Sequence, residues 1–92
     1  MVTVHELRIE QHFLDALLDG TKTFEVRLND RGYQKGDLLV FWDLGVDVIP
    51  TPRRWFKVTY VHSGLGMEHG YVVLGVQPYT KADFELRAGA ES

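Results

Sequence analysis

Two basic side chains and one acidic side chain, Lys22, Glu25 and Arg27, fall within six consecutive residues. A lysine ammonium and an arginine guanidinium bind phosphate groups, and a carboxylate accepts hydrogen bonds from amino and imino groups. In a cleaving site, the carboxylate would act as a general base while the cations stabilise developing negative charge. The plainer interpretation is an ion pair on a solvated strand, worth about 0–1 kcal/mol. Because further polar residues follow at 29–31, the clustering favours a ligand site.

The spacing of these three charged residues indicates whether they suit ligand recognition or catalysis. Alternation over residues 22–28 predicts a strand with Glu25 and Arg27 on one face and apolar residues on the other. A carboxylate close to Lys22 would stabilise its ammonium form, so the pair suits recognition of a phosphate or a nucleobase better than proton abstraction by lysine. For RNA cleavage, Glu25 would be the base toward a 2′-hydroxyl.

A helix over residues 10–19 is expected to lead into this strand, because its apolar residues recur at helical spacing. Gly20 suits the left-handed position that follows a helix. Residues 3–9 alternate and predict a first strand with His5 on its mostly apolar face. The expected order therefore begins with strand, helix and strand.

Three further strands are predicted in the remainder of the chain. Residues 38–42 are apolar on both faces and should form a central, buried strand. A long strand is expected at residues 53–62, and the last strand at residues 71–76. Glycine and proline predict loops at 43–52 and 63–70. Five short strands with one early helix predict an α+β fold, a small and partly open β-barrel plugged by the helix.

Bulk composition limits the possible functions. A chain of 92 residues predicts one domain, here residues 1–78, with residues 79–92 as a partly ordered tail or short helix. The absence of cysteine excludes disulfides and thiolate metal sites. A net charge of −3 and a pI near 5.7 argue against bulk, nonspecific nucleic-acid binding but leave room for a small nucleotide pocket. With no signal segment and no long apolar segment, we expect a cytoplasmic protein without membrane contact. The oligomeric state stays open, with a monomer favoured.

Other residues are candidates for a supporting role. Tyr33, in a polar turn, is the aromatic ring best placed by sequence to stack on a base. Ser63 and Gly64 open a loop whose backbone N–H groups would meet a phosphate, although a plain hairpin connection has the same composition. The four histidines lack the spacing of a local metal-ligand pair, so we predict no metal and no cofactor, with His5 packed or hydrogen-bonded.

The segment Gly20-x-Lys22-x-x-Glu25-x-Arg27, preceded by an amphipathic helix, resembles the signature of ASCH domains, which belong to the PUA-like fold. The whole chain resembles a small prokaryotic and phage branch of that superfamily, a family of unknown function. The matching stretches occur in the expected order between residues 4 and 77: 5–9, 20–30, 35–37, 58–61 with Ser63 and Gly64, and 70–75.

The resemblance implies a small β-barrel with a cleft beside the motif and an RNA or nucleotide ligand. Relatives include RNA-binding modules, an amidohydrolase acting on acetylated cytidine and a proposed ribonuclease, so binding and catalysis both stay open. The amidohydrolase branch uses Lys-x-x-Thr, and here Glu25 stands in place of that threonine, which argues against this activity. A protein-interaction domain is a third possibility. The expected ligand-binding residues are Lys22, Glu25, Arg27, Tyr33, Ser63 and Gly64; in an enzyme, Lys22 and Glu25 would be catalytic.

Overall fold

A computed structural model describes residues 2–43, 54–80, 82–83 and 85–86. Within these residues the chain forms β1 (Val4–Ile9), α1 (Gln11–Asp19), β2 (Phe24–Leu28), β3 (Leu38–Asp43), β4 (Arg54–Ser63) and β5 (Tyr71–Pro78). The predicted order of elements is confirmed, with boundaries that differ by one or two residues. Asp43, expected in a loop, instead ends β3. Most of the expected loop at 43–52, and Arg53, lie outside the described residues.

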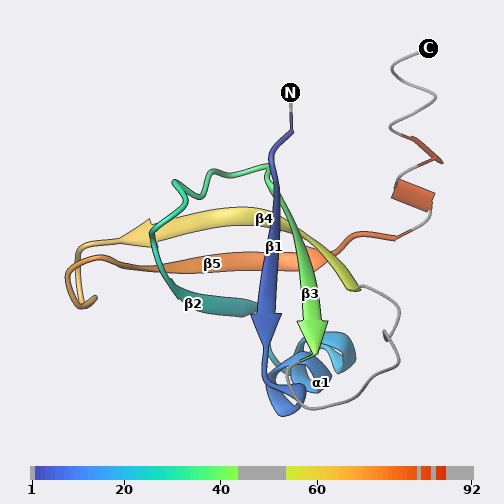
Figure 1. Cartoon of the computed structure of the whole chain (residues 1–92), viewed down its shortest axis with the longest axis horizontal. Helices are drawn as coiled ribbons and strands as arrows, with labels where there is room; N and C mark the ends of the chain where they lie inside the picture. The colour runs from blue at the N-terminus through green and yellow to red at the C-terminus, as the bar shows by residue number, and fades with distance from the viewer. Residues whose placement is uncertain (1, 44–53, 81, 84, 87–92) are drawn as a thin grey trace.

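The strands form one mixed sheet in the order β1-β3-β4-β5-β2. The pair β1–β3 is parallel, because α1 and β2 intervene between them, and the other pairs are antiparallel. The strands β1 and β3 run steeply across the direction of β4, β5 and β2, and α1 lies at the end toward which β1 and β3 point (Figure 1). The sheet therefore curls into a half-barrel with one helix, which agrees with the small α+β fold and partly open barrel predicted above.

The core lies on the concave side of this half-barrel. The strand β1 alternates exposed and buried residues, with His5, Leu7 and Ile9 inward as predicted. All described side chains of β3, residues 38–41, are buried, as expected for a central strand. The helix α1 contributes Leu14 and Leu17. Burial of these apolar side chains supplies the main driving force for the fold.

A β-bulge in β4 shapes the middle of the sheet. The pairing of β4 with β5 shifts register between Val58 and Tyr60, opposite Gly75. A Cβ atom at position 75 would lie 3.1 Å from Thr59 Oγ1 and 3.3 Å from Tyr60 Cβ, so glycine allows this close approach. A bulge bends its strand and redirects side chains. Here it turns Tyr60 to the convex side, while Val61 packs against the core.

Two features beyond the sheet complete the description. Residues 82–83 and 85–86 have helical backbone. In the described part of the chain, no helix combines the length and apolar character that crossing a membrane requires.

Candidate functional site

The junction between α1 and β2 positions Lys22. Gly20 ends the helix with φ of 86°, the left-handed conformation predicted for it. Lys22 N–H donates to Ala16 O at 3.0 Å, and the hydroxyl and N–H of Thr21 donate to Asp19 Oδ1 at 2.6 and 2.8 Å. These two bonds lower the pKa of Asp19, because they stabilise its carboxylate. Hydrogen bonds from Thr21 and Lys22 back to the end of α1 therefore hold the turn that leads into Lys22.

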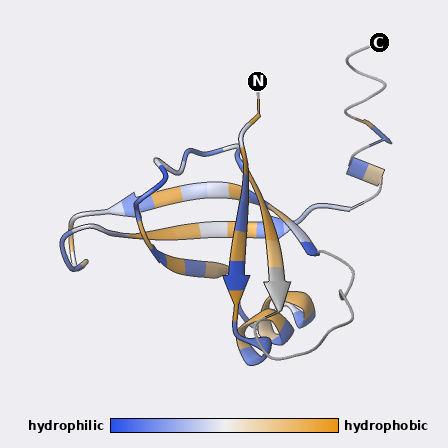
Figure 2. Cartoon of the chain, viewed as in Figure 1, coloured by the Kyte–Doolittle hydropathy of each residue, from blue (hydrophilic) through white to orange (hydrophobic). Residues whose placement is uncertain are grey.

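The strand β2 presents its charged residues to the concave side of the sheet. Glu25 is only 4% exposed and Arg27 is half-buried, whereas Phe24, Val26 and Leu28 are exposed. The alternation along β2 is visible in its colouring (Figure 2). The predicted division of β2 into two faces is confirmed, but the polar face turns inward and the apolar face outward. This orientation reverses the usual arrangement of a half-exposed strand.

Glu25 is the centre of a charged cluster, defined here as Lys22, Glu25 and Arg27. Lys22 Nζ donates to Glu25 Oε1, and Arg27 Nε donates to Glu25 Oε2 at 3.2 Å. Both carboxylate oxygens therefore have a cationic partner, which compensates the cost of burying the charge. Two cations against one anion leave a net charge of +1 in the cluster at neutral pH.

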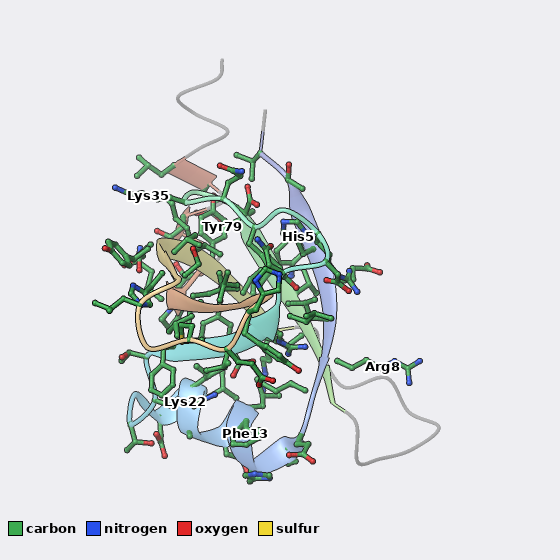
Figure 3. The ribbon with its side chains drawn as sticks, turned by 90° about the vertical axis from the view of Figure 1, so that its left-hand side faces the viewer. His5, Arg8, Phe13, Lys22, Lys35 and Tyr79 are labelled. Carbon is green, nitrogen blue, oxygen red and sulfur yellow. The ribbon has the colours of Figure 1, made fainter. Side chains whose placement is uncertain are left out.

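Aromatic rings surround the lysine side of the charged cluster. Lys22 Nζ lies 4.6 Å from the centroid of the Phe13 ring and 5.2 Å from that of Phe24. Both distances allow cation–π attraction. Figure 3 shows Lys22 and Phe13 near one another at the helix end of the molecule. The ammonium is thus held by α1 and β2 together, which keeps it beside Glu25.

Arginine side chains join the two ends of the sheet. Arg27 Nη2 donates to Arg8 O at 2.8 Å, and Arg31 Nη1 donates to Glu6 O at 3.1 Å. Both acceptors belong to β1, the strand at the opposite end of the sheet from β2. The guanidinium of Arg27 also lies 5.7 Å from the centroid of Phe41. Arg27 therefore has a structural role in addition to its contact with Glu25.

A hairpin pocket of about 450 Å³ opens at the other end of β2, next to the loop that joins β4 and β5. This volume falls within the range of small-ligand sites. Its lining residues are Asn29, Ser63, Gly64, Met67, Glu68, His69, Gly70, Tyr71 and Val72. Ser63 and Gly64 are the two residues for which the sequence predicted a phosphate-contacting loop. Glu68 and His69 were not among the expected ligands, although the three glycines of this loop mark it in the sequence.

Strand register connects the hairpin pocket with the charged cluster. Val72 pairs with Ser63 of β4 and with Arg27 of β2, so these three residues form one row across three strands. Residues directly opposite in antiparallel strands project to the same face. Because neighbouring strands lie about 4.8 Å apart, Ser63 and Arg27 are separated by roughly 10 Å across the concave face. Val72, the middle residue of this row, is only 2% exposed and belongs to the core.

Tyr33 does not occupy the exposed position that its polar neighbours indicated. The residue is 4% exposed and belongs to the core, so its ring is not available for stacking on a base in this structure. Its ring centroid lies 4.8 Å from that of His5, and its N–H donates to Asn29 Oδ1 at 3.1 Å. Burial raises the pKa of the Tyr33 hydroxyl, against the opposing influence of Arg27 and Arg31. The expectation of an exposed ring is wrong because tertiary packing covers this turn.

The described histidines serve different purposes. His5 Nε2 lies 2.8 Å from Asp37 Oδ2 inside the protein, which confirms the predicted packed and hydrogen-bonded histidine. His62 Nε2 lies 2.9 Å from Leu65 O, and His12 is exposed. Among the residues that the structure describes, no group of three His, Cys, Asp or Glu side chains is arranged to hold a metal ion.

These features define a small half-barrel domain with a cation-flanked, buried carboxylate on its concave face. The chain belongs to the family described as "Domain of unknown function (DUF3850)", whose model matches residues 4–76. That range includes both the charged cluster and the hairpin pocket. The chain is also similar to the "Uncharacterized 12.9 kDa protein in GpA 3'region" of Escherichia phage P2, with 38% identity over 48 residues. The matched stretch is 50% of this chain and 44% of the phage protein, so it spans less than half of that relative.

Proposed function

We propose that this protein is an ASCH-type, PUA-like domain that binds RNA or a single nucleotide on the concave face of its half-barrel. The observation that carries the proposal is the row Arg27–Val72–Ser63, whose two ends belong to the net positive charged cluster and to the hairpin pocket. A phosphate would contact the guanidinium of Arg27 and the ammonium of Lys22. The sugar or base would occupy the hairpin pocket beside Ser63 and Gly64.

The different burial of the three side chains in the charged cluster indicates a different role for each. Glu25 already accepts hydrogen bonds from both cations, so it orients them rather than meeting a ligand with a free charge. Lys22 and Arg27 each retain about a fifth of their side-chain exposure, with 18% and 22%. Each can therefore donate to a phosphate while staying paired with Glu25. Lys22 and Arg27 would be ligand contacts, and Glu25 would hold them in position.

A binding assay with a labelled short single-stranded RNA tests this function. Lys22→Ala should weaken binding about five- to tenfold, because it removes one phosphate contact. Lys35→Ala is the matched control, since this exposed lysine lies far from Lys22 (Figure 3). With one or two phosphate contacts, the logarithm of affinity should fall with the logarithm of salt concentration with a slope of about −0.7 to −1.4. Equal affinity of both variants and the wild type would contradict the proposal.

A second candidate is an enzyme that cleaves RNA or acts on a nucleoside, such as a weak ribonuclease or an amidohydrolase of acetylated cytidine. The observation that favours it is the presence of His69 and Glu68 in the hairpin pocket, where a histidine could supply the acid that cleavage needs. Glu25→Gln and His69→Ala would then lose turnover while keeping RNA affinity. Intact RNA after prolonged incubation with the wild type would reject this alternative.

A further inference from the structure

The convex side of the half-barrel carries an unusual set of exposed apolar residues. Phe24, Val26 and Leu28 of β2 are 43%, 49% and 52% exposed, and Tyr60 of β4 is 65% exposed. Soluble sheets normally place polar residues on the side that faces water. We define the outer apolar face as Phe24, Val26, Leu28, Tyr60, Tyr71 and Val73.

Strand register makes this face continuous. Gly75 pairs with both Phe24 and Tyr60, so these two rings flank the one position in the row that has no side chain. Val73 pairs with Val26, and Tyr71 pairs with Leu28. The bulge opposite Gly75 is what turns Tyr60 outward into this row. The apolar residues therefore cover three adjacent strands instead of being scattered singly.

We propose that the outer apolar face is the interface of a symmetric dimer in which two copies of this chain pack these faces together. None of its six residues carries a charge, so packing these six side chains against their copies brings no like charges together; His62, which pairs with Val73, and Lys22, 5.2 Å from the Phe24 ring centroid, are polar neighbours of the face. Tyrosine and phenylalanine are also enriched in the centres of protein interfaces. Another copy of the chain satisfies these features without any further partner.

The area of the face agrees with a weak dimer. Its exposed side chains present roughly 500 Å² per copy, taking 150–250 Å² for a whole aromatic residue. Two copies would then bury about 1,000 Å² of total surface, which is the lower limit for a specific interface. We therefore expect a dissociation constant in the micromolar range, with monomer at high dilution. The expectation of a monomer from sequence took no account of the outward turn of β2.

The dimer leaves the concave face free, so this inference does not depend on the proposed nucleotide site. Sedimentation equilibrium of the full chain from about 1 µM to 1 mM tests it directly. The wild type should shift from monomer to dimer across this range. Val26→Lys on β2 and Tyr60→Glu on β4 should each weaken association at least tenfold, since both would bury a charge in the interface.

A matched control distinguishes association through the outer apolar face from nonspecific hydrophobic association. Leu18→Lys on α1 replaces a leucine of similar exposure, 43%, that belongs to the helix and not to the three strands of the outer apolar face, and it should dimerise as the wild type does. Thermal melts should show that all three variants fold. A wild type that stays monomeric at the highest concentration would overturn the proposal. So would folded Val26→Lys and Tyr60→Glu variants that associate as strongly as the wild type.

Discussion

The guanidinium of Arg27 donates a hydrogen bond of 2.8 Å to the carbonyl oxygen of Arg8, joining strands β2 and β1 from opposite ends of the sheet. A closed barrel would make this connection with backbone hydrogen bonds along the two strands. Here side chains of Arg27 and Arg31 supply the connection. The concave face consequently has a polar seam, and the charged cluster lies on it.

Arg27→Ala should lower the free energy of unfolding by about 3 kcal/mol, because it removes one partner of a buried carboxylate. Lys22 remains as the second partner, which keeps the loss at the lower end of the range for broken buried pairs. Urea unfolding measures the change. Arg31→Ala is the control, with an expected loss of about 1 kcal/mol for an exposed hydrogen bond. Equal losses of unfolding free energy in Arg27→Ala and Arg31→Ala would contradict this explanation, because they would show that Arg27 does not stabilise the buried carboxylate of Glu25.

Tyr33 predicts a loss of stability at high pH. Its pKa is raised in the folded protein because burial disfavours the phenolate. The unfolded chain, with a pKa near 10, then releases its proton first, so the stabilising contribution is complete below about pH 10 and is lost as pH rises through the folded pKa. Between pH 9 and 11 the free energy of unfolding of Tyr33→Phe should therefore fall less than that of the wild type. The difference should be about 1 kcal/mol for each unit by which the folded pKa of Tyr33 exceeds the unfolded one. Parallel pH profiles for the two proteins would contradict this.

The glycine that ends α1 has a local backbone requirement. Gly20→Ala should cost about 1–2 kcal/mol, because φ of 86° is unfavourable for any residue with a Cβ atom. No heavy atom would contact the added methyl group, so the cost comes from the backbone alone. Thermal melts of Gly20→Ala and Gly20→Asn measure it. Asparagine tolerates this conformation better and should lose less; a larger loss for asparagine would contradict the backbone explanation.

The buried pair His5–Asp37 ties the first strand to the turn before β3. Asp37 Oδ2 accepts from Gln34 N–H at 2.9 Å as well as contacting His5 Nε2. Asp37→Ala should destabilise the protein by about 1–3 kcal/mol, since it leaves buried groups without their partner. Asp30→Ala removes an exposed aspartate and should change stability by less than about 0.5 kcal/mol. Chemical denaturation of both variants distinguishes the two cases.

The sequence predicted the elements well because periodicity is a local property. The alternation along β2 and the left-handed Gly20 are both visible in neighbouring residues, and both are confirmed. The direction in which β2 faces could not be predicted. A charged face turns inward only if distant groups compensate it, and one of these is Arg8 O on another strand. The alternation of residues along β2, taken alone, favours an apolar face turned inward and a charged face turned outward.

Long-range packing also explains the error at Tyr33. Its neighbours in the chain are polar, which is typical of an exposed turn, but the ring packs against His5, 28 positions earlier in the sequence. The hairpin pocket was partly predictable from local sequence. Ser63 and Gly64 were recognisable from a glycine-rich loop, whereas their alignment with Arg27 depends on the register of three strands.

The central claim, a nucleotide site on the concave face, is tested most directly by amide NMR. The ¹⁵N-labelled protein would be titrated with a short single-stranded RNA and then with free nucleosides, and the RNA checked afterwards for cleavage. We predict shifts concentrated at residues 20–28 and 62–72, with the convex residue Tyr60 unchanged. An absence of shifts with every ligand, or shifts confined to the convex side, would contradict the account and leave the charged cluster a structural feature.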